Sequence, residues 1–247
     1  MRSCRFELVR VLGRTALASA CAILIIKGAP SHSPNKSRPY AFESTAVGSK
    51  ALTKWPTCST IYYSIDLNNA PKNATAVLAR ATSLARRITG LTFHRIGTVN
   101  PPSFASYDSS GSVAPVIFEW VDANQLFGQK NVNAVTVPIV NPSHTRFTSG
   151  IVLFNSDMNS AFQADPKFTN NLVLHELGHI LGLGDVSDPA QVMNYYLEPN
   201  TTIGTYAPGD LAGLSKLYPD AHDCVQSSKL NSRSIDRIAS EKEKQWG

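Results

Sequence analysis

Two histidines and a glutamate in the sequence HELGHILGLGD have the types and spacing needed for metal chemistry. On a helix, His175 and His179 lie four residues apart on one face, so both imidazoles can reach a single metal ion. The 3.6-residue period places Glu176 about 100° further around the same helix. There its carboxylate can act as a base on a metal-bound water instead of binding the metal.

The residues after the second histidine can supply a third ligand. Gly182 can adopt a positive φ, so the chain can leave the helix and turn back. Asp185 can then offer a carboxylate to the same metal. Three protein ligands and an open fourth position are typical of a catalytic zinc site, not of a structural one. The alternative is an amphipathic helix with two unrelated histidines and an ordinary glycine C-cap.

This stretch resembles the extended zinc motif of the metzincin metalloproteases, with Asp185 where most members carry a third histidine. The similarity to the matrixin branch covers roughly residues 52–219. It implies a metzincin fold and a single catalytic zinc ion held by His175, His179 and Asp185. The other segments that carry the resemblance are Lys54–Trp55, Ile61–Ile65, Gln191–Tyr195 (the Met-turn region) and Tyr206–Tyr218 (the closing helix).

The resemblance also implies a function. We expect an exported zinc-dependent endopeptidase that hydrolyses peptide bonds in extended protein substrates, with Glu176 as general base on zinc-bound water. Met193 would pack beneath the ligands. Tyr195 lies where astacins and serralysins place a metal-side tyrosine, so its phenol could bind zinc or donate to the oxyanion. Matrixins lack that tyrosine, and the alternative is that Tyr195 packs or lines a pocket.

One other interpretation of the site remains open, as does a calcium site elsewhere in the chain. A catalytically silent metzincin-fold module could bind proteins at the cell surface, although a pure binding module has no use for Glu176. Asp108 and Asp157 could contact calcium, but no ligand-spaced acidic run supports a calcium site.

The ends of the chain differ in composition from its middle. Residues 1–27 contain five basic residues and an uncharged run, as in a signal peptide or an N-terminal anchor. We expect a linker at 28–50, the catalytic domain at 51–220 and a polar tail at 221–247, which can hold a short helix. The rest of the chain carries 18 basic and 17 acidic residues, so nothing indicates nucleic-acid binding. We expect a secreted monomer, or a membrane-anchored protein that faces outside if the first segment is uncleaved.

Two of the four cysteines lie outside this first segment. Cys58 is near the start of the expected domain and Cys224 lies just past its end. In an exported chain, an even pair favours a disulfide. The alternative is two free buried thiols.

The elements that must position these residues follow from hydrophobic periodicity. The pattern predicts five strands, near 61–65, 91–96, 116–121, 132–140 and 150–154. Pro138 within the fourth indicates a sheet edge, where its missing N–H needs no partner. The resemblance to metzincins implies that such an edge binds the substrate as an added strand. The alternative is a plain protected edge.

One helix is expected to begin at Pro71 and to end at Gly90. A second is expected to begin at Asp165–Pro166, an N-cap followed by proline. Together with the closing helix they make three. The pattern therefore predicts an α+β domain. The resemblance makes it a twisted mixed sheet of about five strands with an antiparallel edge strand.

Overall fold

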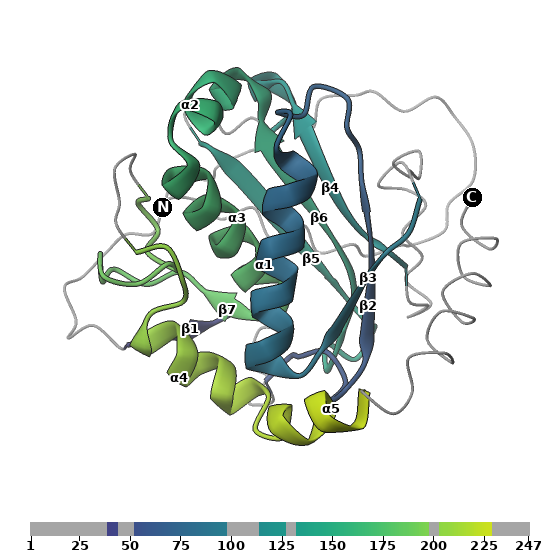
Figure 1. The fold of residues 1–247 in the computed structure, drawn as a ribbon. Coiled ribbons are helices and arrows are strands. Elements are labelled where there is room, and N and C mark those ends of the chain that lie inside the picture. The colour runs from purple at the N-terminus through teal and green to yellow at the C-terminus, as the bar shows by residue number, and fades with distance from the viewer. Residues whose placement is uncertain (1–38, 44–51, 98–113, 127–131, 198–202, 229–247) are drawn as a thin grey trace, which may run out of the picture.

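The structure is a computed structural model that describes residues 39–43, 52–97, 114–126, 132–197 and 203–228 (Figure 1). The segment expected to be a signal peptide or anchor lies outside the described residues, as does Asp108. Within the described part of the chain, no helix is both long and apolar enough to cross a membrane.

A five-stranded mixed sheet forms the centre of the domain, in the order β3-β2-β4-β6-β5. The first four strands in this order run parallel, and β5 pairs antiparallel with β6 at the edge. The arrangement confirms the predicted α+β fold with an antiparallel edge strand. The strands are β2 (Thr60–Ile65), β3 (Thr92–Arg95), β4 (Val116–Val121), β5 (Ala134–Val140) and β6 (Phe147–Asn155).

Burial along the strands follows their position in the sheet. All nine residues of β6 are buried, as expected for a strand that is covered on both faces. Every residue of β5 is only partly buried, and β5 pairs with β6 alone among the described strands. Pro138 lies opposite Gly150 in this pair. The proline is thus on the edge strand, where the sequence predicted it.

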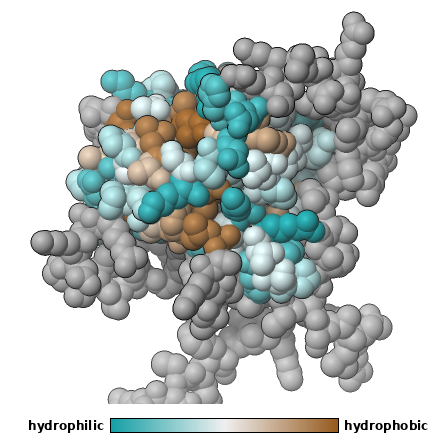
Figure 2. Space-filling view, turned by 90° about the horizontal axis from the view of Figure 1, so that it is seen from below, coloured by the Kyte–Doolittle hydropathy of each residue, from teal (hydrophilic) through white to brown (hydrophobic). Residues whose placement is uncertain are grey.

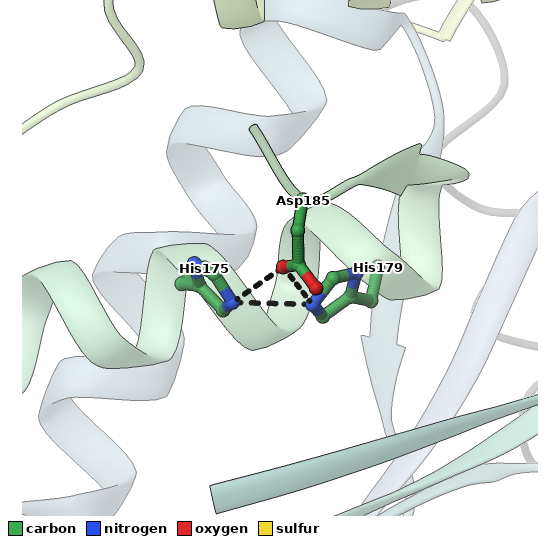
Figure 3. A group of neighbouring side chains, drawn as sticks. All are labelled: His175, His179 and Asp185. Atoms are coloured by element: carbon green, nitrogen blue, oxygen red, sulfur yellow. Dashed lines mark hydrogen bonds and ion pairs between the residues drawn. The ribbon is translucent and has the colours of Figure 1, made fainter. Parts of the chain in front are cut away.

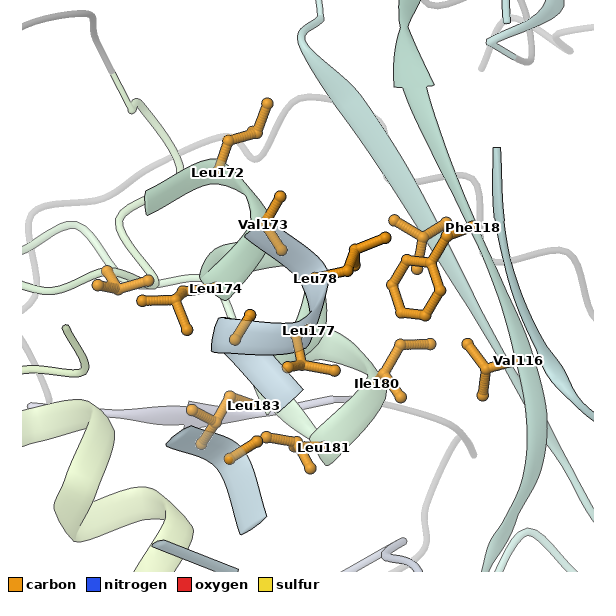
Figure 4. Packing of buried hydrophobic residues seen from close by; sticks show 14 of the residues in the cluster. Leu78, Val116, Phe118, Leu172, Val173, Leu174, Leu177, Ile180, Leu181 and Leu183 are labelled. Carbon is orange, nitrogen blue, oxygen red and sulfur yellow. The ribbon is translucent and has the colours of Figure 1, made fainter. Parts of the chain in front are cut away.

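Helices α1 (Ala74–Thr89) and α3 (Pro166–Leu181) pack together against the sheet (Figures 1 and 4). Leu78 of α1 and Ile180 of α3 meet Phe118 of β4 in one buried core. Each such side chain contributes roughly 1.5–3 kcal/mol by leaving water. Gly90 ends α1 at φ 70°, as the sequence predicted. Packing in this main core therefore holds α3 in place against the sheet.

The structure contains more helix than the three predicted segments. Helix α4 (Pro208–Leu217) is the expected closing helix, and α5 (Ala221–Ser228) lies in the tail, where a short helix was one expectation. Helix α2 (Asn159–Ala164) was not predicted. Both α2 and α5 are short and have too few apolar residues to show a helical period. Cys224 of α5 is buried. The folded unit thus continues past residue 220.

A second, two-stranded sheet joins distant parts of the chain. Strand β1 (Ala41–Phe42) pairs antiparallel with β7 (Leu183–Gly184), which lies within the zinc motif between His179 and Asp185. Strand β1 lies within the stretch expected to be a linker. Two paired residues are too few to give a periodic signal in the sequence.

The surface at the lower end of Figure 1 is of mixed character. Figure 2 shows small hydrophobic patches on this face, separated by hydrophilic residues. The large hydrophobic side chains exposed in the described part of the chain are Leu52, Leu67, Tyr195, Tyr196 and Leu211.

Candidate metal centre

Helix α3 carries the two histidines through the interior of the domain. The side chain of Asp165 caps its start by accepting from the N–H groups of Lys167 and Phe168, both at 3.0 Å. Almost every residue from Phe168 to Leu181 is buried. A helix that is covered nearly all round is fixed by its packing, so the ligands that it carries have little freedom.

Three donor atoms converge beside this helix (Figure 3). The Nε2 atoms of His175 and His179 are 3.1 Å apart, and Asp185 Oδ1 lies 3.3 Å from each. Ligands about 2.0–2.1 Å from a tetrahedral zinc are roughly 3.3–3.4 Å from one another. The two imidazoles and the carboxylate thus have the spacing that a bound zinc ion requires, and they form a group that could hold a metal ion.

The Nδ1 atom of each imidazole, which faces away from the converging donor atoms, lies within hydrogen-bond distance of a backbone carbonyl. His175 Nδ1 lies 2.8 Å from the carbonyl oxygen of Val192, and His179 Nδ1 lies 2.9 Å from that of Leu183. A ring that donates from Nδ1 keeps the lone pair of Nε2 for a metal. His179 Nδ1 also lies 2.7 Å from the carboxylate of Glu43.

Asp185 reaches the histidines because the chain reverses at Gly182. This residue has φ 101°, and its N–H donates to the carbonyls of Gly178 and His179. An added Cβ would approach Thr53 O to 3.2 Å, so both conformation and space favour glycine. Burial alone would raise the pKa of Asp185, but its contacts with the two imidazoles hold that pKa well below the usual range. The carboxylate is therefore ionised, as a metal ligand must be.

Met193 lies beneath the helix that carries the ligands. It is buried, and its sulfur fills the notch left by the missing side chain of Gly178. The backbone of this turn is fixed by Asp210 of α4, which accepts from the N–H groups of Val192 at 2.9 Å and Met193 at 3.3 Å. The closing helix thus holds the Met-turn against the ligands. Asp210 lies in a segment that the sequence singled out, but its role was not predicted.

Glu176 is 5% exposed and has a partner on the edge strand. The hydroxyl of Thr136 in β5 donates to Glu176 Oε2 at 2.6 Å. Thr136 was missed by sequence reasoning. The available signal was the period of two, which places Thr136 on the opposite face of β5 from Val135 and Val137.

The remaining predicted residues are placed as follows. Tyr195 is 50% exposed, and its backbone N–H donates to Val186 O at 3.0 Å. Its role at the metal stays a prediction. Cys58 and Cys224 are joined in a disulfide, with Cα atoms 5.0 Å apart. The bond ties α5 to the segment before β2.

Comparison with known proteins agrees with this geometry. A search of curated proteins finds no match to the chain. The sequence profile of the Matrixin peptidase family matches residues 54–219, more than half of the chain and the whole of the central sheet and metal centre. The protein therefore belongs to the matrixins, a family of zinc metallopeptidases.

Proposed function

We propose that the protein is an exported endopeptidase that cleaves peptide bonds in extended protein substrates, with one zinc ion held by His175, His179 and Asp185. The observation that carries the proposal is the convergence of three donor atoms at tetrahedral ligand spacing beside a buried glutamate. The buried glutamate favours a peptidase over a catalytically silent binding module.

The zinc ion would supply a Lewis acid that lowers the pKa of water and polarises the scissile carbonyl. Glu176 would take a proton from the attacking water and deliver it to the leaving amine. Thr136 holds one oxygen of this carboxylate at 2.6 Å, which restricts the directions in which it can accept a proton. The exposed phenol of Tyr195 is the proposed donor to the developing oxyanion, and full activity in Tyr195→Phe would remove it from that role.

An extended substrate would bind along β5. This strand pairs with β6 on one side, and among the described strands nothing pairs with its other side. The backbone N–H and C=O groups on that side can therefore form hydrogen bonds with the backbone of a peptide of any sequence. Because β5 also carries Thr136, a substrate on this edge would lie beside the proposed base.

A digest of casein tests the activity. Wild type should cleave, whereas Glu176→Gln and a chelator-treated sample should not, and Glu176→Gln should still bind one zinc per chain. Cleavage that survives the substitution or the chelator would reject the mechanism. Zinc-loaded wild type without any cleavage would favour the silent module.

Export is supported by the composition of residues 1–27 and by the disulfide, which oxidising compartments favour. Sequencing the mature N-terminus after expression in a secreting host distinguishes secretion from membrane anchoring. A start beyond residue 27 indicates secretion, and an intact Met1 indicates an anchor.

A further inference from the structure

A short segment that is far from the zinc motif in sequence reaches the metal centre from behind. We call residues 39–43 the docked segment. Ala41 pairs with Gly184 and Phe42 with Leu183, and the N–H of Glu43 donates to the carbonyl of Gly182 at 2.9 Å. The docked segment thus adds a strand to the very turn that returns Asp185 to the histidines.

The rest of the domain leaves room for this docking. A Cβ on any one of three glycines would crowd or overlap the docked segment, and these are Gly184, Gly209 and Gly213. The ammonium of Lys216 on α4 lies 5.0 Å from the centre of the Tyr40 ring, and Phe42 packs against the main core. The segment is therefore an integral part of the packed structure.

Docking places one carboxylate on a ligand histidine. Glu43 Oε1 lies 2.7 Å from His179 Nδ1, and the Glu43 side chain is only 4% exposed. The carbonyl of Leu183, the residue paired with Phe42, lies 2.9 Å from the same nitrogen. Two acceptors thus face Nδ1, which fixes the proton there and turns Nε2 toward His175 and Asp185.

We propose that Glu43 is a positioning residue of the metal centre, through which the docked segment sets the tautomer and orientation of His179 and hence the affinity for the metal. The inference rests on the proposed zinc site. Carboxylates that support a ligand histidine in this way typically contribute 10–100-fold in metal affinity. A chain that begins after residue 43 should therefore bind zinc more weakly, whereas one that begins at Pro39 should not.

The test uses the full chain and measures the zinc dissociation constant by competition with a chromophoric chelator. Glu43→Ala removes the carboxylate and should weaken zinc binding about 10–100-fold. Glu43→Gln keeps the size and one acceptor oxygen, so its affinity should fall between those of wild type and Glu43→Ala. Glu119→Gln is the matched control, because Glu119 is a partly buried glutamate of β4 outside the centre. The visible spectrum of the Co²⁺-substituted proteins reports the ligand geometry, which a purely structural role of Glu43 would leave unchanged.

The outcomes separate this inference from the proposed function. If wild type binds no zinc, the proposed function fails and this inference fails with it. If wild type binds zinc and both Glu43 variants bind it within twofold of wild type, this inference alone is overturned. If Glu43→Ala does not fold, Glu43→Gln decides: weaker zinc binding with an altered Co²⁺ spectrum supports the role, and wild-type values refute it.

Discussion

The contact between Gly178 and Met193 predicts that Gly178→Ala changes the free energy of unfolding in opposite directions, depending on whether Met193 is present or replaced by alanine. In Gly178→Ala, the new Cβ would overlap the Met193 sulfur, which is buried below the helix. Alanine favours a helix over glycine by roughly 0.5–1 kcal/mol, whereas overpacking a core costs about 1–3 kcal/mol. The cost of overpacking should exceed the gain in helix preference. We therefore expect the free energy of unfolding to fall by about 0.5–2 kcal/mol.

Removing the methionine should reverse that sign. Met193→Ala alone should cost about 2–5 kcal/mol, because it leaves a cavity beneath the ligands. In this background Gly178→Ala meets no sulfur, and only the helix preference remains. The substitution should then raise the free energy of unfolding by about 0.5–1 kcal/mol.

Urea denaturation of the four proteins, followed by circular dichroism in the presence of chelator, measures this double-mutant cycle without a contribution from bound metal. The coupling energy between the two sites should be about 1–3 kcal/mol. Equal effects of Gly178→Ala in both backgrounds would show that the sulfur does not restrict residue 178. Stabilisation of the wild-type background by Gly178→Ala would refute the packing argument outright.

Three further predictions concern the turn, the base and the disulfide. Gly182→Ala forces a side chain into φ 101°, which costs about 1–3 kcal/mol, and should weaken zinc binding because Asp185 follows this turn; wild-type affinity in a zinc titration would contradict it. Thr136→Val keeps the shape but removes the donor to Glu176, and kcat/KM on a peptide should fall about tenfold while Thr136→Ser stays near wild type. Equal rates for both Thr136 variants would argue against the bond. The disulfide closes a loop with a sequence separation of 166 residues, so Cys58→Ser with Cys224→Ser should lower stability by about 2–5 kcal/mol in denaturant titrations. An unchanged midpoint would show that the bond is not formed in the isolated protein.

Much of the fold follows from local pattern. The alternation of apolar residues located β2, short apolar runs located β4 and β6, and Pro138 indicated the edge strand. These features are readable because they depend on residues that are close together in the chain. The short helix α2 was missed for the same reason, since it has no apolar period of its own.

The candidate ligands could also be predicted from the sequence, because a helix fixes the relative position of residues four apart. Asp185 was within reach because one glycine turn separates it from His179. Thr136, Asp210 and Glu43 could not be found in this way. Each acts on the site across a long sequence separation, through a sheet edge, a closing helix or a docked segment.

The sequence alone therefore determined the candidate ligand residues, the proposed general base and the class of fold, since the 3.6-residue period of a helix and the two-residue period of a strand are local properties. Only the tertiary structure decided what holds those residues in place. Buried hydrogen-bond partners are selected by the packing of distant elements, and no spacing along the chain encodes which of them will meet.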